Sequence, residues 1–156
     1  MKIELTHDME TVAAIITHPE IYPFCSDDGS PPASDFMAVE TKAFFHLLVT
    51  EDNVKMGVFS VQQLNAILFE IHTSLLPCCR GRNARWAAEL VIEWLFSNTR
   101  CLKLISWVPN VTAPAARLAA SVGMVREGVC TASFLKNGQL CDMVLFGLSK
   151  RVDVCQ

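Results

Sequence analysis

A short apolar run that passes through a basic loop directly into a helical pattern is the feature that most constrains the fold of this chain. Residues 66–72 are apolar, partly β-branched and too few for a globular helix, which predicts a strand. After the loop at 75–85, apolar residues recur at the spacing of one helix face, at Ala87, Leu90, Val91 and Trp94. Asn83 is predicted to cap this helix, which runs to about Asn98. A strand followed by a helix in this way indicates a mixed α and β fold.

The loop between the predicted strand and helix carries three arginines, Arg80, Arg82 and Arg85. The first N–H groups of a helix lack intrahelical partners, and the helix dipole adds partial positive charge at the same end. Three full positive charges at such a helix start predict a site that holds a phosphate. The alternative is that the arginines serve solubility alone, as basic residues do at many strand–helix connections.

Short apolar segments separated by turn residues continue along the rest of the chain. We expect strands at 2–7, 44–50, 54–61, 66–74, 103–108, 125–135 and 140–148. The expected helices run to about residues 18, 98 and 123, and their predicted caps are Asp8, Asn83 and Thr112. The segment 22–36 is rich in Pro, Ser, Asp and Gly and is expected to be a long loop or an irregular segment with a short helix. This order predicts an α+β fold, with a mostly antiparallel central sheet and flanking helices, in one domain spanning residues 1–156.

The composition of the chain excludes several classes of protein. A hydrophobic fraction of 51% with 19% charged residues is typical of a packed globule. The net charge of −3 gives no global basic surface, so no nucleic-acid partner is expected. No apolar stretch approaches the eighteen residues of a membrane span, and the first residues lack the apolar core of a signal peptide. We therefore expect a cytoplasmic protein with no membrane partner.

Seven cysteines are present, but no pair has the Cys-x-x-Cys spacing. The four histidines are scattered along the chain, so no metal site is expected. Most of the cysteines are expected to pack as small hydrophobic residues in a reduced protein. The alternative concerns Cys78 and Cys79, because the neighbouring Arg80 would lower the pKa of a thiol and make it reactive.

Three segments of the chain resemble the GNAT superfamily of N-acetyltransferases. Residues 77–84 resemble the pyrophosphate-binding loop of this family, whose pattern is Arg/Gln-x-x-Gly-x-Gly/Ala. Residues 108–118 are similar to its Asn-x-x-Ser/Ala helix start, and residues 123–128 stand where the family has Gly-Phe followed by Glu-Gly. The resemblance covers roughly residues 60–148, in the family's order and spacing, and looks most like small GNAT-like proteins encoded by bacteriophages.

The resemblance implies an acyl-CoA N-acyltransferase fold in which two central strands splay apart and admit acetyl-CoA as a co-substrate. Here those strands are 66–74 and 103–108. Backbone N–H groups near Leu75 and Leu76 would polarise the thioester carbonyl, in the manner of an oxyanion hole. The other residues implied to bind the cofactor are Arg80, Gly81, Arg82, Asn83, Ala84, Arg85 and Thr112.

The acceptor amine of such an enzyme must lose a proton before it attacks the thioester. In this family a carboxylate or histidine near the end of the central strand commonly serves as the base. Glu70 and His72 are two residues apart on the predicted strand and therefore point to the same face. Glu70 is the first candidate base and His72 the second. The alternative is a glutamate and a histidine that are merely solvated or ion-paired on a half-exposed strand.

The function implied is transfer of an acetyl group from acetyl-CoA to a primary amine of a small molecule or a protein. The chain also departs from the family pattern. Ala119 stands where many members have a tyrosine general acid, Asn83 and Arg85 where the loop has small residues, and Thr112 where the helix start has an amide. These departures favour the alternative of a catalytically silent GNAT-fold phage protein that acts by binding, as an assembly or accessory protein in the host cytoplasm. The acceptor and the formation of a homodimer are left open by the sequence.

Overall fold

The computed structural model describes residues 1–151 of the 156-residue chain. The strands are β1 (Lys2–Thr6), β2 (Phe44–Glu51), β3 (Val54–Gln63), β4 (Leu68–Leu75), β5 (Lys103–Pro109), β6 (Val125–Lys136) and β7 (Gln139–Ser149). The helices are α1 (Met9–Ile16), α2 (Tyr22–Cys25), α3 (Arg82–Asn98) and α4 (Ala113–Ser121), with single 3-10 turns η1 (Ala33–Asp35) and η2 (Pro77–Cys79). The predicted α+β class is confirmed.

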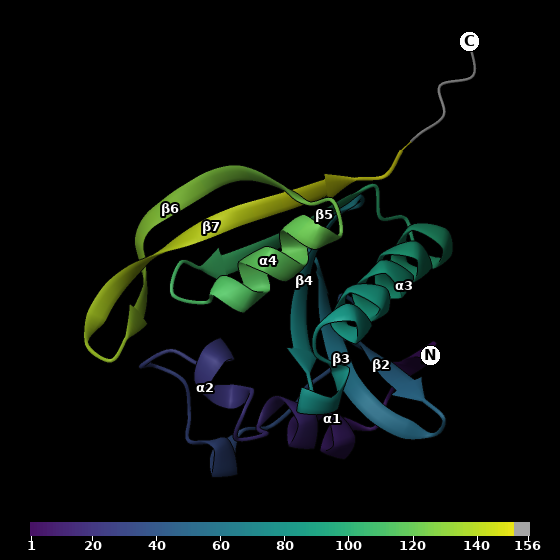
Figure 1. Ribbon diagram of the computed structural model, residues 1–156, viewed down its shortest axis with the longest axis horizontal. Coiled ribbons are helices and arrows are strands. Elements are labelled where there is room, and N and C mark those ends of the chain that lie inside the picture. Colours follow the sequence, from purple (N-terminus) through teal and green to yellow (C-terminus); the bar gives the residue numbers. More distant parts are fainter. Residues whose placement is uncertain (152–156) are drawn as a thin grey trace.

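All seven strands belong to one sheet, in the order β1-β2-β3-β4-β5-β7-β6 (Figure 1). Every neighbouring pair is antiparallel except β4 and β5, which run parallel. The predominantly antiparallel sheet expected from the sequence is therefore confirmed. The parallel pair joins the strands on either side of α3, because a helix is the usual connection that returns a chain to a parallel neighbour.

The two faces of the sheet are covered by different helices. The larger apolar core lies between the sheet and helices α3 and α4, and its most buried side chains include Leu47, Phe59, Val91, Leu95 and Leu104. A smaller core lies under α1 on the opposite face, formed by Val12, Ile15, Ile21, Leu48 and Val58. Burial of a side chain of this size contributes about 1.5–3 kcal/mol, so these two cores hold the layers together.

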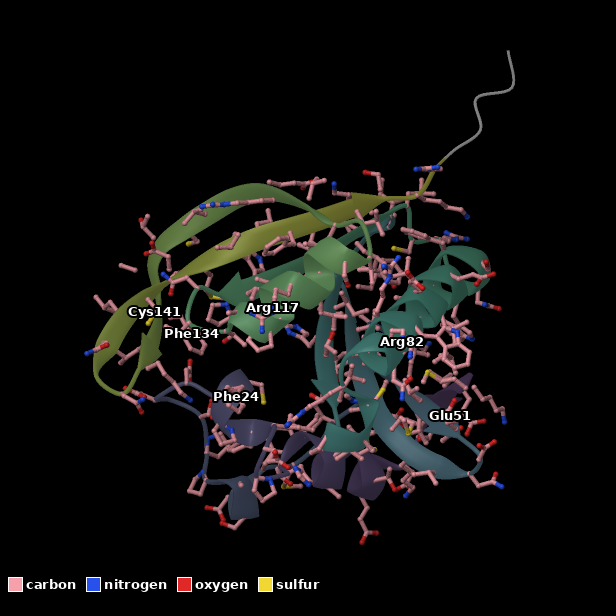
Figure 2. All side chains as sticks on the ribbon, in the orientation of Figure 1. Phe24, Glu51, Arg82, Arg117, Phe134 and Cys141 are labelled. Atoms are coloured by element: carbon pink, nitrogen blue, oxygen red, sulfur yellow. The ribbon has the colours of Figure 1, made fainter. Side chains whose placement is uncertain are left out.

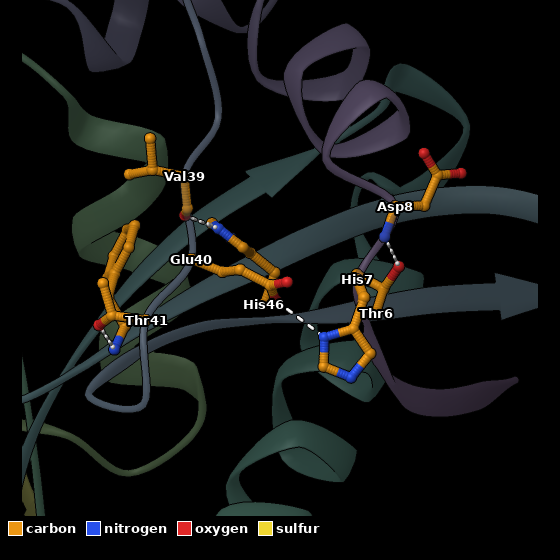
Figure 3. A network of polar contacts seen from close by, with 8 residues as sticks. Thr6, His7, Asp8, Val39, Glu40, Thr41 and His46 are labelled. Atoms are coloured by element: carbon orange, nitrogen blue, oxygen red, sulfur yellow. Dashed lines mark hydrogen bonds and ion pairs between the residues drawn. The ribbon is translucent and has the colours of Figure 1, made fainter.

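A buried histidine fastens the segment between η1 and β2 to the sheet (Figure 3). His46 is 1% exposed, and its Nε2 lies 2.9 Å from the carbonyl oxygen of Val39. A carbonyl only accepts, so Nε2 carries the proton and Nδ1 accepts the hydroxyl hydrogen of Ser60 at 2.9 Å. Nearby, His7 and Glu40 form an exposed pair at 2.8 Å. The segment is thus held by polar contacts at two adjacent positions.

Helix and strand ends show where local side chains decided the structure. Asp8 caps α1 as predicted, accepting the Thr11 backbone N–H at 2.9 Å and the Thr11 hydroxyl at 2.6 Å. Thr112 occupies the predicted cap position of α4, but its side chain makes no capping bond. β4 begins two residues later than predicted, because the side chain of Asn65 accepts the N–H groups of Ile67 and Leu68 and holds a turn.

The predicted cap of α3 is wrong. Gly81 takes the cap position with a φ of +65°, a conformation that glycine adopts without steric cost, and the helix begins at Arg82. Asn83 therefore lies inside the first turn. The predicted hairpin at Asn137-Gly138 is confirmed, and both residues have positive φ, as its turn requires. Residues 22–36 contain the short helix α2 and the 3-10 turn η1, joined by irregular chain, as the expectation of an irregular segment with a short helix requires.

Candidate functional site

β4 and β5 form a fork in the middle of the sheet. They are paired only from Leu68–Glu70 to the facing segment 103–105, a ladder of three residue pairs. Beyond that ladder β4 continues to Leu75 and β5 to Pro109 as the two strands diverge (Figure 1). The pair of splayed strands implied by the resemblance is therefore present, and it leaves one edge of each strand without a neighbouring strand.

The backbone of β4 directs one N–H group into this fork. Leu76 donates its N–H to the carbonyl of Met56 at 2.9 Å, and Leu75 lies opposite Gly57. In an antiparallel ladder this pattern makes Gly57 and Leu75 a non-hydrogen-bonded pair, so the N–H of Leu75 points away from β3. The Leu75 N–H is therefore open to a ligand in the fork. The Leu76 N–H, which the sequence placed in the same role, is instead engaged by Met56.

The N-terminus of α3 follows the end of β4 in the sequence, after the 3-10 turn η2. The first helical bond runs from the N–H of Arg85 to the carbonyl of Gly81 at 3.3 Å. The N–H groups of Arg82, Asn83 and Ala84 precede that bond and have no intrahelical acceptor. Gly81 and Arg82 are exposed, and apart from the chain neighbours of Gly81 no atom lies within 4 Å of its Cβ position. An anion placed here would meet three N–H donors and the positive end of the helix dipole.

The three arginines of the loop have different environments. Arg85 pairs with Glu89 one turn along the helix, its Nε 2.7 Å from a carboxylate oxygen, which turns it away from the helix end. Arg80 lies 3.2 Å from Glu20, an exposed residue between α1 and α2. Arg82 is exposed at the start of α3 (Figure 2), and within residues 1–151 no carboxylate lies at ion-pair distance from it. Arg82 is therefore the loop arginine most available to an external anion.

The two candidate bases lie side by side on β4. Glu70 and His72 are separated by 3.4 Å between a carboxylate oxygen and Nε2, as their predicted common face requires. The Glu70 side chain is 18% exposed and that of His72 is 53% exposed. His72 lies opposite Ser60 of β3, and Ser60 lies opposite His46 of β2, so these three side chains share one face of the sheet. Glu70 is the last β4 residue of the three-pair ladder and lies at the closed end of the fork, where the two strands begin to diverge.

The position of the family's tyrosine acid offers no substitute acid. Ala119 is 7% exposed and belongs to the larger core under α4. A departing thiolate would therefore be protonated by water rather than by a side chain at that position. Because a thiolate is a good leaving group, it can depart without a general acid at position 119.

The thiol hypothesis is wrong for Cys79. Its side chain is fully buried in the larger core, and its pKa is raised to about 11 by desolvation first and then by the neighbouring Cys78 and Glu51. Cys78 is exposed, and its sulfur lies 3.9 Å from the sulfur of Met56. All six cysteines of the described residues are free thiols. The expectation of small buried hydrophobic cysteines holds for Cys79, Cys101 and Cys141.

A cavity of about 360 Å³ lies where α2, the start of α4 and the β6–β7 hairpin come together. Phe24 and Phe134, both labelled in Figure 2, contribute to its walls. The complete lining is Pro23, Phe24, Val111, Thr112, Phe134, Lys136 and Asn137. Thr112 is also one of the residues implied to bind the cofactor, so this cavity and the candidate cofactor site share a residue.

Four hydrogen bonds clamp the N-terminal loop to the hairpin beside this cavity. The two carboxylate oxygens of Asp28 accept the N–H groups of Asn137 at 2.8 Å and Gly138 at 2.7 Å. The N–H of Asp28 donates to the carbonyl of Leu135 at 3.0 Å, and the Lys136 ammonium donates to the carbonyl of Ser26 at 2.6 Å. The backbone bonds hold the pKa of Asp28 below its ordinary value. We call this set of contacts the Asp28 clamp.

The sequence did not predict the Asp28 clamp or the Arg80–Glu20 pair. The Asp-Gly pair at 28–29 and the Asn-Gly pair at 137–138 each indicate a turn. Nothing in either sequence specifies that the carboxylate of the first turn accepts the N–H groups of the second. The one available signal was Asp28, an aspartate whose carboxylate caps nothing in its own turn and is therefore free to bond elsewhere. Within the described range, no group of three metal-ligating side chains is gathered, and no helix there is both long and apolar enough to cross a membrane.

The fold is shared with known acetyltransferases. A spermidine N-acetyltransferase from Vibrio cholerae, solved in complex with CoA and spermine, aligns with a TM-score of 0.77 and 14% identity over 95% of this chain and 94% of that one. The ribosomal-protein-S5-alanine acetyltransferase from Vibrio fischeri aligns with a TM-score of 0.72 and 16% identity, covering 94% and 91% of the two chains. At these identities the likeness establishes the fold.

Two comparisons concern the sequence. The chain is 26% identical over 102 residues to protein p31 of Acyrthosiphon pisum secondary endosymbiont phage 1, which covers 65% of this chain. The chain spans 66% of the length of that phage protein. The family model described as "Protein of unknown function (DUF2824)" matches residues 31–154.

Proposed function

The chain belongs to the DUF2824 family, and we propose that it is an N-acetyltransferase that moves the acetyl group of acetyl-CoA to a primary amine. The observation that carries the proposal is the β4–β5 fork together with the start of α3, where Arg82 has no carboxylate partner within the described residues. The fold likeness to two acetyltransferases, one solved with CoA and spermine, supports the same reading.

The pyrophosphate of acetyl-CoA would bind at the N-terminus of α3. The N–H groups of Arg82, Asn83 and Ala84 supply three donors, and the Arg82 guanidinium supplies a full positive charge. Gly81 allows the phosphates to approach the backbone closely. Arg80 would add a second charge by leaving Glu20, an exposed pair whose loss costs little.

The reaction would take place at the fork. The carboxylate of Glu70 takes a proton from the acceptor ammonium, directly or through a water, and the neutral nitrogen attacks the thioester carbonyl carbon. The Leu75 N–H donates to the carbonyl oxygen as negative charge develops there. The carbon–sulfur bond then breaks and the CoA thiolate leaves. The attacking nitrogen gives its remaining extra proton to water as the amide forms, and the thiolate takes a proton from water.

Cofactor binding is tested by thermal unfolding with increasing acetyl-CoA. A ligand at a hundred times its dissociation constant adds about 2.7 kcal/mol of stability, which raises the midpoint by several degrees. Arg82→Ala should weaken the affinity by roughly tenfold or more, because a charge-assisted bond is worth about 1.5–3 kcal/mol. Arg100→Ala removes an exposed arginine at the other end of α3 and should leave the affinity unchanged. Equal affinities for both variants would contradict the assignment of the helix start.

Glu70→Gln tests the base. It keeps the shape of the side chain and removes the proton acceptor, so turnover should fall by about a hundredfold to ten-thousandfold while acetyl-CoA binding is retained. Measurement of kcat across pH separates this from a structural loss. Glu89→Gln, on the exposed face of α3, is the matched control. Unaltered turnover in Glu70→Gln would remove this residue from the mechanism and leave His72 as the remaining candidate.

A second candidate function is a catalytically silent protein that acts by binding in phage assembly. It is favoured by Ala119, buried where a general acid would stand, and by the relationship to a phage protein. This candidate predicts either no thermal shift with acetyl-CoA, or a shift without acetyl transfer to any amine. Transfer that depends on Glu70 would exclude it.

A further inference from the structure

We propose that the outer edge of β1, together with a groove between β1 and α3, binds an extended segment of a partner protein in which an arginine stands between apolar residues. The segment would join the sheet as one more strand beside β1. This surface is separate from the β4–β5 fork, because β2 and β3 lie between β1 and β4 in the sheet.

β1 ends the sheet with a regular backbone edge. It pairs with β2 from Lys2 to Thr6 without a shift in register, and within the described residues no strand lies on its outer side. Alternate residues of an antiparallel strand direct both the N–H and the C=O away from the paired neighbour, so β1 presents a row of unpaired donors and acceptors. At the other edge of the sheet, β6 has two register shifts and a positive φ at Ala132, irregularities that hinder pairing. β1 is therefore the edge better suited to receive a strand.

A groove of about 300 Å³ lies beside this edge, between β1 and α3. Its apolar lining is half-buried and consists of Met1, Ile3, Leu90 and Trp94. Lys2 and Glu4 alternate with the lining residues of β1, and they pair with each other at 2.6 Å on the opposite face. An added strand would lie about 4.8 Å from β1, so every second side chain of that strand would face the groove.

The polar part of the groove lacks a positive partner. Glu93, Ser97 and Asn98 line it from the last turns of α3. Glu93 is exposed, and across residues 1–151 no basic group lies at ion-pair distance from it. The Asn98 amide nitrogen donates to the carbonyl of Trp94 at 2.9 Å, so its oxygen is the group left for a ligand. A carboxylate, an amide oxygen and a hydroxyl beside an indole suit a guanidinium group, which has five donors, no acceptor and a planar face that stacks on aromatic rings.

The edge and the groove together specify the partner. The backbone edge requires an extended segment, as in other cases where a peptide adds a strand to a sheet, and the groove takes an arginine side chain. Leu5, on the groove side of β1, is 44% exposed, which favours apolar residues two positions before and after the arginine. A second copy of this chain is a less suitable occupant, because α3 lies against β1 and two α3 helices would meet above the paired strands.

The binding test uses the peptide acetyl-Ser-Val-Thr-Arg-Thr-Val-Ser-amide, in which the valines and the arginine occupy every second position. Fluorescence anisotropy of a labelled copy gives its dissociation constant for the protein without acetyl-CoA. We expect saturable binding that weakens roughly tenfold or more when glutamate replaces the arginine of the peptide. Glu93→Gln should weaken binding of the arginine peptide by about fivefold or more. Glu89→Gln, at an exposed position of α3 outside the groove lining, is the matched control and should leave the affinity unchanged.

Hydrogen exchange measured by NMR tests the added strand separately. The peptide should slow exchange of the alternate β1 amides that face the open edge. Arginine amide, which has the side chain but no extended backbone, should occupy the groove without protecting them. Peptide binding that leaves every β1 amide unprotected would overturn the added strand.

Two further outcomes would overturn the proposal. One is equal affinity for the arginine and glutamate peptides, or no saturable binding at millimolar peptide. The other is a protein that sediments as a dimer and is dissociated by the peptide, which would make a second copy the occupant. None of these outcomes bears on acetyl transfer, because the test is made without acetyl-CoA and on a different edge of the sheet.

Discussion

Two adjacent cysteines, Cys78 and Cys79, differ sharply in their exposure to solvent. Cys79 is fully buried with its pKa raised to about 11, whereas Cys78, in the same 3-10 turn, is exposed. At pH 7.5 fewer than roughly one in a thousand Cys79 thiols would be ionised.

This contrast predicts selective alkylation. Iodoacetamide at pH 7.5, followed by peptide mass spectrometry, should modify Cys78 and leave Cys79 intact in the native protein. Urea should make both reactive, because burial is the cause of protection. Modification of native Cys79 at a rate similar to that of Cys78 would show that the turn opens readily and that the described burial does not persist in solution.

At the scale of elements, the contact between β3 and β4 depends on a missing side chain. A Cβ on Gly57 would lie 2.6 Å from the carbonyl oxygen of Ser74 and 2.8 Å from the Cα of Leu75. Both are backbone atoms of β4, which cannot move aside as the end of a flexible side chain can. Gly57 therefore allows β4 to place the Leu75 N–H at the fork.

Gly57→Ala should destabilise the protein by about 1–3 kcal/mol, the usual cost of overpacking. Urea unfolding at equilibrium measures this loss in the free energy of unfolding. If the variant is too unstable to assay, the substitution can be made in a stabilised background, where acetyl-CoA binding should weaken because β4 shifts. Gly128→Ala is the control, because its Cβ would meet nothing within 4 Å. Similar unfolding midpoints for the two variants would contradict the tight approach of β3 and β4.

Elements with a strong local signal were predictable, and contacts between distant turns were not. The alternating apolar strands, the Asp8 cap and the Asn137-Gly138 hairpin follow from residues within a few positions of one another. The start of α3 was misplaced because asparagine and glycine both occur at helix starts, and only the backbone conformation shows that Gly81 takes the cap. For the candidate site, the spacing of Glu70 and His72 predicted their common face. The pairing of Arg80 with Glu20 required the tertiary fold, which brings together residues sixty positions apart.

At the scale of the whole molecule, the Asp28 clamp joins residues more than a hundred positions apart. Its carboxylate has a lowered pKa because it accepts the Gly138 and Asn137 N–H groups. A carboxyl whose folded pKa is depressed contributes stability above its unfolded pKa, near 3.9, and loses that contribution as the pH falls through the folded value. The stabilisation is therefore complete at neutral pH and disappears in acid.

This sign gives a test by thermal unfolding from pH 7 to pH 2.5. Asp28→Ala should lower the midpoint at neutral pH, and its difference from the wild type should stay constant to about pH 4 and then shrink. Asp35→Ala, on an exposed 3-10 turn, should show a smaller difference throughout. A difference between the wild type and Asp28→Ala that persists unchanged at pH 2.5 would exclude the carboxylate as its source.

The three-pair ladder between β4 and β5 has a consequence for how the molecule is made. It divides the sheet into two plates, and each plate is one unbroken length of chain: residues 2–75 form the strands of the first, and residues 103–149 those of the second. During synthesis the first plate and its helix α3 are complete before the second begins to emerge. The Asp28 clamp needs Gly138, so it forms only when the closing hairpin has left the ribosome. A chain released early would carry the four strands of the first plate and the exposed start of α3, but it would lack Leu104, Ala119 and Met124, which complete the larger core.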